Sequence, residues 1–255
     1  MLDCRIRDVL VLCYHAVSPT WPAPLSVQAE VLEAQLTSLV RRGYRGATFT
    51  DALAHRGEDR LLAVTFDDAY HSVLDRALPV LSRLGLPGTL FVPTDYIDTG
   101  ALLAWPGTDR WLAGPHASEL VGLSWADIAA LIAEGWEVGS HTCSHPRLTQ
   151  IGGARLEREL VLSREVCEDR LGTPCRSLAY PYGDVDDRVV AAARRAGYEA
   201  AATLPKSLDV RGPLEWPRVG VYHGDSRWRF ELKVSPQVRR ARTSKPWLAL
   251  ERIRS

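Results

Sequence analysis

Short apolar segments alternate with longer segments of helical periodicity along most of this 255-residue chain. The apolar segments, which we expect to form strands, cover residues 9–17, 47–49, 61–66, 89–92, 136–140, 177–180, 200–203 and 218–221. Strands that alternate with helices are typical of a parallel sheet with crossover helices. A count of about seven strands favours a closed, irregular barrel over an open doubly wound sheet, but the alternation itself does not decide closure.

Two adjacent carboxylates, Asp67 and Asp68, follow directly after the apolar segment 61–66. An Asp-Asp pair at such a place is commonly a turn or a helix N-cap. In an α/β fold with parallel strands, functional sites gather at the carboxyl ends of the strands. The pair is therefore a candidate for chemistry as well as for capping.

Two imidazoles four residues apart, His141 and His145, follow the segment 136–140 in the same way. Alone, they could be ordinary hydrogen-bonded histidines. One carboxylate and two imidazoles, however, form a facial set of ligands for a divalent ion, with positions left open for water and substrate. The spare carboxylate would lie beside the metal, where a general base is useful. Together the two motifs predict metal-assisted hydrolysis.

A stiff turn follows the segment 177–180, with Pro181 and Gly183 on either side of Tyr182. Such a turn can point a backbone N–H outward, where it could stabilise a tetrahedral oxyanion. The alternative is an ordinary strand-to-helix turn in which Asp184 or Asp186 is the N-cap of the next helix. The sequence leaves both interpretations open.

The order of these motifs, T-F-D-D, then H-T-x-x-H, then Y-P-Y-G, resembles the polysaccharide deacetylase family, which is carbohydrate esterase family 4 and is also called NodB-like. The resemblance extends from about residue 9 to residue 221 and covers most of the chain. It implies an α/β fold, the irregular (β/α)7 barrel of that family. It also implies an activity, the metal-dependent removal of N-acetyl groups from amino sugars.

The resemblance assigns roles to matching positions. It implies that Asp67 is the catalytic base and that the backbone N–H of Tyr182 assists the oxyanion. The metal ligands would be Asp68, His141 and His145, which would hold one divalent ion. We prefer zinc for this ion because imidazole and carboxylate suit it, although other divalent ions would serve.

The apolar run that starts at Val9 ends in Tyr14-His15. This opening resembles a permuted branch of the family that includes poly-β-1,6-N-acetylglucosamine deacetylases, and it implies that His15 is the general acid. The competing candidate is His223, which follows another apolar run. Many family members carry an arginine where this chain has Ala179, so the residue that orients the base must come from elsewhere. Arg218 is a candidate because it lies near the end of a short strand.

The expected reaction releases acetate and a free amine from an N-acetylated sugar in a glycan, a glycolipid or a small glycoside. An O-deacetylase or a cyclic-amide hydrolase with the same site is an alternative within the class. A carbohydrate-binding relative that has lost turnover is the alternative outside it. The complete set of predicted base and ligands argues against that last reading, because a binding protein has no need of the base.

One catalytic domain is expected over residues 1–236, with a long loop insertion at 94–123. Trp105, Trp111 and His116 lie in this loop, which could form the wall of a sugar subsite or could pack on itself. A basic tail follows at 237–255, where Trp247 lies among arginines. This tail could contact an anionic membrane surface weakly, or it could be a solvated helix that packs on the barrel.

The composition narrows the possible partners and compartment. Lys plus Arg and Asp plus Glu both total 31, so nothing indicates nucleic acid as a partner. The five cysteines are scattered and do not suggest a disulfide framework, and we expect Cys143 to serve in packing. Charged residues among the first eight positions argue against a signal peptide, so a cytoplasmic location is expected. The oligomeric state is left open.

Overall fold

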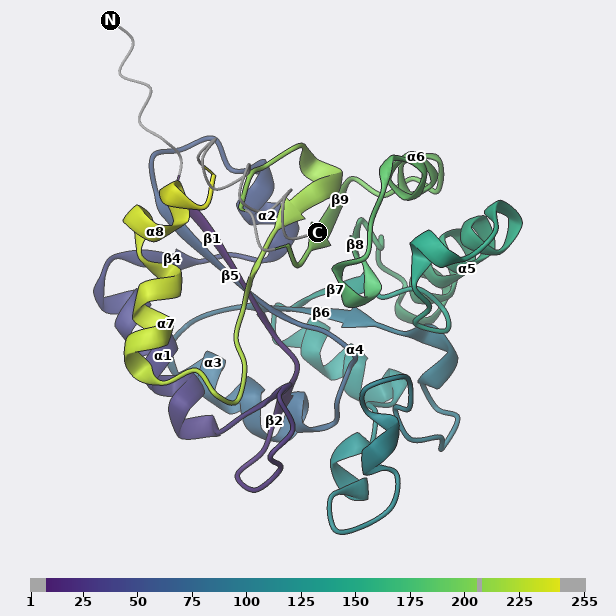
Figure 1. The fold of residues 1–255 in the computed structure, drawn as a ribbon, viewed down its shortest axis with the longest axis horizontal. Coiled ribbons are helices and arrows are strands. Elements are labelled where there is room, and N and C mark those ends of the chain that lie inside the picture. The colour runs from purple at the N-terminus through teal and green to yellow at the C-terminus, as the bar shows by residue number, and fades with distance from the viewer. Residues whose placement is uncertain (1–7, 206–207, 244–255) are drawn as a thin grey trace, which may run out of the picture.

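The computed structural model describes residues 8–205 and 208–243. Parallel strands form its main sheet at the centre of the molecule, with helices around them (Figure 1). In spatial order the strands are β10 (Trp216–Pro217), β9 (Ala200–Thr203), β8 (Ser177–Ala179), β7 (Glu137–Ser140), β6 (Gly88–Val92), β5 (Arg60–Phe66), β1 (Val9–Tyr14) and β11 (Val219–Gly220). Outside this path, β4 (Tyr44–Gly46) pairs with β5, and β2 (Ala16–Val17) pairs with β3 (Ser26–Val27) as a small second sheet.

The segment that contains β10 and β11 closes the barrel. In β10, Trp216 pairs with Ala202 of β9, and in β11, Val219 pairs with Leu12 of β1. Because only Arg218 separates β10 from β11, one short stretch of chain joins both edges of the sheet. Among the described residues the barrel thus has seven strand positions, and the expected irregular (β/α)7 barrel is confirmed.

Helices cover the outside of the barrel. In Figure 1, α5 and α6 lie on one side of the sheet, and α1, α7 and α8 lie on the other. Their bounds are α1 (Ala29–Arg41), α2 (Phe49–Ala54), α3 (Leu78–Arg83), α4 (Trp125–Ala133), α5 (Gly153–Leu171), α6 (Asp187–Arg195), α7 (Arg227–Val234) and α8 (Pro236–Ala241). Within the described ranges, no helix combines the length and the apolar character that crossing a membrane requires.

Two strand predictions need correction. Residues 47–49 are not a strand, because β4 ends at Gly46 and Thr48 is the N-cap of α2, where its side chain accepts a hydrogen bond from the Asp51 backbone. The capped turn buries Phe49 against Phe91, with ring centroids 5.8 Å apart. The predicted strand at 9–17 is interrupted at His15, between β1 and β2. The apolar pattern could not show either break, since buried turns are apolar too.

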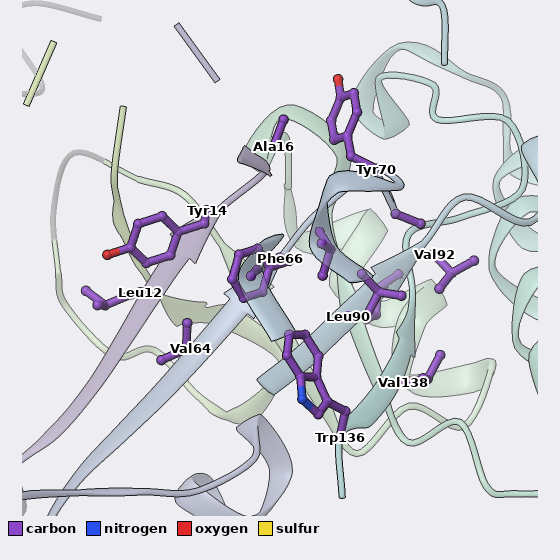
Figure 2. Close-up of a cluster of buried hydrophobic side chains, with 14 of the residues drawn as sticks. Leu12, Tyr14, Ala16, Val64, Phe66, Tyr70, Leu90, Val92, Trp136 and Val138 are labelled. Atoms are coloured by element: carbon purple, nitrogen blue, oxygen red, sulfur yellow. The ribbon is translucent and has the colours of Figure 1, made fainter. Parts of the chain in front are cut away.

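The barrel strands bury side chains on both faces. Successive residues of a strand point to opposite faces, so each strand contributes to two clusters. The larger cluster fills the space between strands and helices and contains a row of aromatic rings, in which Phe66 lies 5.5 Å from Trp136 and 5.7 Å from Tyr14 (Figure 2). The smaller cluster has the alternate strand residues, including Ala63, Phe91, Ala179, Ala200 and Ala202. These mostly small side chains leave room inside the barrel for the polar residues at its carboxyl end.

The predicted tail begins as part of the packed structure. Helix α8 contains Arg239, which pairs with Asp8 at the amino end of β1. This ion pair anchors residues 237–243 to the barrel. Trp247, for which we predicted a contact with a membrane or with the barrel, lies outside the described residues.

Candidate metal-dependent active site

A cavity of about 540 Å³ opens at the carboxyl ends of the barrel strands. Each strand delivers its functional group where it ends: β1 is followed by His15, β5 by the two aspartates, and β7 by His141. The cavity lining includes all six side chains that the sequence singled out, namely His15, Asp67, Asp68, His141, His145 and Tyr182. The structure thus brings together residues that are up to 167 positions apart in the chain.

Asp68, His141 and His145 form a compact group, and their ligand atoms all lie within 4.8 Å of one another. The Asp68 Oδ1 atom lies 3.3 Å from Nε2 of His141 and 3.4 Å from Nε2 of His145. This oxygen is buried and receives no well-aligned hydrogen bond from the residues that the structure describes. A buried carboxylate oxygen without a donor, facing two imidazole nitrogens, is the arrangement that a divalent cation would satisfy.

A hydrogen bond orients the ring of His141, and another holds the backbone of His145. The Nδ1–H of His141 donates to the Ala179 carbonyl over 2.8 Å, which leaves Nε2 as the ligand atom. The backbone N–H of His145 donates to the Thr142 hydroxyl over 3.1 Å. Burial lowers the pKa of His145 to about 3, so this imidazole is neutral, as a metal ligand must be. The three residues therefore fit the predicted ion in identity and position.

The backbone at the site is held in a sparsely populated conformation. Asp68, Thr142 and His145 have positive φ angles of 74°, 68° and 55°. Non-glycine residues in this region carry a conformational cost of about 1 to 3 kcal/mol each, and they persist only where the surroundings enforce them. Their concentration around one cavity marks it as the functional region of the barrel.

Asp67 lies outside the ligand group because Arg218 holds it. The guanidinium donates to both carboxylate oxygens, over 2.6 and 2.7 Å, and also donates to the Thr65 hydroxyl over 3.0 Å. The expected substitute for the arginine missing at Ala179 is thus present, at the point where the barrel closes. A fork-shaped, bidentate pair fixes the plane of the carboxylate as well as its position.

The pair with Arg218 keeps Asp67 ionised. Burial raises the pKa of Asp67, but the adjacent guanidinium outweighs burial and holds the pKa well below its ordinary value. The Cys13 thiol adds a weak hydrogen bond to the same carboxylate over 3.4 Å. Asp67 is therefore a carboxylate that is ready to accept a proton and is kept apart from the ligand group.

His15 lies in the site and His223 does not. The Nε2 atom of His15 is 4.0 Å from Oδ2 of Asp67, and its Nδ1 atom is buried without a hydrogen-bond partner in the described part of the chain. Burial lowers the pKa of His15. By contrast, His223 is exposed and is absent from the cavity lining, while its backbone N–H donates to the Pro24 carbonyl. Its position therefore favours His15 over His223 as the general acid.

Tyr182 has the unusual backbone that its turn predicted. Its φ angle is 61°, within a 3₁₀ turn at Pro181–Gly183, and its ring lies 4.7 Å from the ring of His145. The oxyanion role of its backbone N–H stays a prediction. Of the two aspartates considered as the N-cap of the next helix, Asp186 takes that position, because its side chain accepts a hydrogen bond from the backbone N–H of Val189 at the start of α6.

The long loop at 94–123 supplies two of its aromatic residues to the cavity. Trp105 stacks on His145, with ring centroids 4.1 Å apart and an interplanar angle of 26°. Trp111 also lines the cavity and meets Trp21 edge-on at 6.0 Å. His116 contacts Trp111 behind this lining. The loop is thus both packed and in contact with the cavity, and sugar binding by it stays a prediction.

No motif in the sequence pointed to Glu159 on α5. This buried carboxylate accepts hydrogen bonds from the backbone N–H groups of Cys143 and Ser144, over 3.0 and 2.9 Å, and from the Ser144 hydroxyl over 2.5 Å. It thereby holds the loop between the two histidines. Cys143 packs its sulfur near the Glu159 carbonyl, 3.6 Å away, in the packing role expected of it.

Comparisons with known proteins agree with this geometry. The family model for polysaccharide deacetylase matches residues 54–201, more than half of the chain. A chitooligosaccharide deacetylase from Sinorhizobium fredii is 28% identical over 162 residues, which cover 62% of this chain and 60% of that protein. The chain thus spans less than two thirds of the length of this curated relative.

Two solved structures share the fold over most of the chain. BC0361, a polysaccharide deacetylase from Bacillus cereus, is 26% identical with a TM-score of 0.71 and covers 89% of this chain and 69% of that one. IcaB from Ammonifex degensii is 25% identical with a TM-score of 0.72, over 93% of this chain and 98% of that one. With the motifs, the barrel and the family match in agreement, the chain belongs to the polysaccharide deacetylase family.

Proposed function

We propose that this protein is a metal-dependent hydrolase that removes the N-acetyl group from an amino sugar and releases acetate and a free amine. One observation carries the proposal: three ligand atoms converge in a cavity that also holds Asp67, a carboxylate kept out of the ligand group by Arg218. The names of the relatives, chitooligosaccharide deacetylase and polysaccharide deacetylase, support an acetylated sugar as the substrate.

Asp68, His141 and His145 would hold the ion, and zinc suits this donor set. A bound divalent ion supplies Lewis-acid chemistry, which lowers the pKa of water and polarises the acetyl carbonyl. The lining of the cavity and the stacked Trp105 ring limit the access of bulk water to these ligands. Metal content of the protein and of His141→Ala, measured by elemental analysis, tests the assignment, and full occupancy in the variant would contradict it.

Asp67 takes the proton of the attacking water. Each of its oxygens accepts from Arg218, and a carboxylate oxygen has a further lone pair that can accept the proton. The oxyanion of the tetrahedral intermediate requires donors beside the acetyl carbon, and we assign this role to the backbone N–H of Tyr182. Arg218 keeps the base oriented during the transfer.

His15 delivers a proton to the leaving nitrogen. Since burial favours its neutral form, it must gain the proton before it donates. Asp67, whose Oδ2 lies 4.0 Å from His15 Nε2, is the carboxylate from which that proton can come. The step is balanced: the water hydroxyl joins the acetyl carbon, the C–N bond breaks, and the water proton reaches the amine.

Acetate release from N-acetylglucosamine oligomers, before and after a chelator, tests the activity. We expect release that stops with the chelator and returns on addition of zinc. Matched O-acetyl sugars and a cyclic amide test the alternatives within the class. Turnover of esters alone would identify an O-deacetylase, and binding without any turnover would identify a carbohydrate-binding relative.

A further inference from the structure

The mouth of the catalytic cavity is cationic. Two exposed arginines, Arg110 and Arg147, contribute to its lining. The only carboxylates in that lining are Asp67, which Arg218 neutralises, and Asp68, which belongs to the ligand group. Neither exposed arginine forms an ion pair within residues 8–205 and 208–243. Asp109 is a nearby carboxylate that acts on the Tyr182 ring, but it forms no ion pair with either arginine among these residues, so both guanidinium groups are available to an anion that enters the cavity.

Arg147 lies close to the reacting centre. Its guanidinium carbon lies 4.1 Å from the centroid of the Tyr182 ring, and that ring lies 4.7 Å from the ring of the ligand His145. One aromatic ring thus separates the guanidinium from the ligand group. Arg110 is placed similarly over Trp111, 5.1 Å from its centroid. A stacked guanidinium keeps its in-plane N–H donors free for a ligand.

The remaining lining restricts where a charged group could lie. The segment that contains Trp21, Pro24 and Leu25 presents apolar side chains to the same cavity. An apolar surface accommodates the apolar face of a pyranose ring but not an anion. A fork of N–H donors with a fixed positive charge matches phosphate and carboxylate groups. The cavity therefore has one apolar region and one region suited to an anion.

We propose that the substrate is an anionic acetamido sugar, whose phosphate or carboxylate group lies beside the acetylated unit and binds Arg147, with Arg110 as the second cationic contact. This inference rests on the proposed function for the reaction itself. It adds the charge of the substrate, which the ligands and the base do not determine. Cationic cavities without counter-charges also concentrate anions and raise their association rates, an effect that salt screens.

The test compares pairs of substrates that differ in charge. N-acetylglucosamine 1-phosphate is paired with methyl N-acetylglucosaminide, and N-acetylmuramic acid is paired with N-acetylglucosamine, so the phosphate and carboxylate sources are separate arms. In at least one arm we expect kcat/KM to favour the charged sugar by about tenfold or more at low salt, the scale of a hydrogen bond to a charged group. Equal values in both arms would overturn the proposal.

Variants assign the preference to the arginine. Arg147→Gln should lower the charged-to-neutral ratio of kcat/KM about tenfold, and Arg147→Lys should keep only part of it, because lysine retains the charge but lacks the fork of N–H donors. The matched control is Arg170→Gln, which changes an exposed arginine of α5 outside the cavity and should leave the ratio unchanged. A ratio unaffected by Arg147→Gln would contradict the assignment.

Binding measurements separate this inference from the proposed function. Calorimetric titration of the metal-loaded protein with the same sugar pairs needs no turnover. If no N-acetyl sugar is hydrolysed but the charged sugars bind more tightly and lose that advantage in Arg147→Gln, the proposed reaction fails and the charge preference stands. If acetate is released without any preference in rate or binding, the reaction stands and the charge preference fails.

Discussion

Two neighbouring aspartates in this protein have different surroundings, which agrees with the different roles predicted for them. The side chain of Asp67 continues the inward-facing series of β5 and meets the buried guanidinium of Arg218. Asp68 follows in a left-handed conformation with a φ of 74°, which turns its carboxylate toward His141 and His145. The left-handed backbone conformation at Asp68 thus points its carboxylate in a different direction from that of Asp67.

Asp67→Asn should abolish most activity and leave the metal in place. The amide keeps the shape of the side chain but removes the basic oxygen, so we expect a loss of roughly 10²-fold or more in kcat, the scale of general-base catalysis. Acetate release and elemental analysis of the same samples provide the measurement. Loss of metal in parallel with activity would instead make Asp67 a ligand.

His15→Ala should affect amides much more than activated esters. The leaving amine needs a proton, whereas the leaving group of an activated acetate ester does not, so the acid matters only for the amide. We expect roughly 10²-fold or more loss on an N-acetyl sugar and a much smaller change on the ester. His223→Ala is the matched control, because His223 is exposed and outside the cavity lining. Amide-selective loss in the control alone would transfer the role to His223.

At the scale of elements, the loop between β7 and α5 carries both predicted ligand histidines and depends on the helix that follows it. Thr142 and His145 have positive φ angles, and Glu159 accepts both amide hydrogens of the intervening residues Cys143 and Ser144. The helix therefore holds the loop in a conformation that few residues adopt unaided. This makes Glu159 a positioning residue for the metal ligands.

Glu159→Ala should weaken metal binding by roughly 10- to 100-fold, the usual effect of removing a group that orients ligands. The reason is that two backbone N–H groups lose their acceptor and the loop relaxes. Titration with zinc or cobalt gives the metal Kd directly. Glu165→Ala, at an exposed position of the same helix, is the control and should bind metal normally. An unchanged Kd in Glu159→Ala would reduce the contact to simple packing.

The two tryptophans of the 94–123 loop should differ in their effects. Trp105 stacks on a ligand imidazole, so Trp105→Ala should reduce activity on sugars of all lengths. Trp111 lines the cavity but stacks on no predicted metal ligand, so Trp111→Ala should lower kcat/KM more for long oligomers than for short ones. The loss of an aromatic contact of about 1 kcal/mol corresponds to roughly a fivefold lower kcat/KM. Equal effects on every length in Trp111→Ala would indicate packing alone.

At the scale of the whole molecule, an ion pair and hydrogen bonds around Asp8 connect distant parts of the chain at the amino end of the barrel strands. Asp8 pairs with Arg239 of α8, accepts from the Tyr44 hydroxyl over 2.9 Å, and accepts from Arg60 at the start of β5 over 3.0 Å. Burial raises the pKa of Asp8, but Arg239 and the two hydrogen bonds outweigh it, so its pKa is lowered. One carboxylate thus joins β1, β4, β5 and the C-terminal helices.

Asp8→Asn should lower the free energy of unfolding by roughly 1 to 3 kcal/mol at pH 7, the scale of hydrogen bonds to a charged group. Because the folded-state pKa lies below the unfolded value of about 3.9, this stabilisation is complete above that pH and is lost as the pH falls through the folded-state pKa. The difference between the two proteins in urea unfolding should therefore shrink as the pH falls below about 3.9.

The control for this measurement is Asp59→Asn. Asp59 forms a more exposed ion pair with Arg45, so its replacement should change stability by about 0.5 kcal/mol or less. If Asp8→Asn has the same small effect, or an effect that does not depend on pH, the ion pair of Asp8 with Arg239 contributes nothing to the stability of the barrel.

The sequence by itself determined the class of fold and pointed to the candidate site residues. The alternation of apolar and helical segments follows from local periodicity, which is encoded residue by residue. The aspartate pair and His141 were recognisable because they directly follow strands, and His145 because it lies four residues after His141; strand ends of a parallel sheet share one edge. The error at residues 47–49 has the same origin, since an apolar pattern cannot distinguish a buried turn from a strand.

Only the tertiary structure decided which distant residues meet. Arg218 reaches Asp67 across 151 positions because the last strand segment closes the barrel, and no local pattern encodes closure. Glu159 reaches the histidine loop only because α5 packs beside β7, and the place of His15 in the cavity adds to the resemblance that already favoured it over His223. Such contacts depend on long-range packing, whereas periodicity and motifs carry only local information.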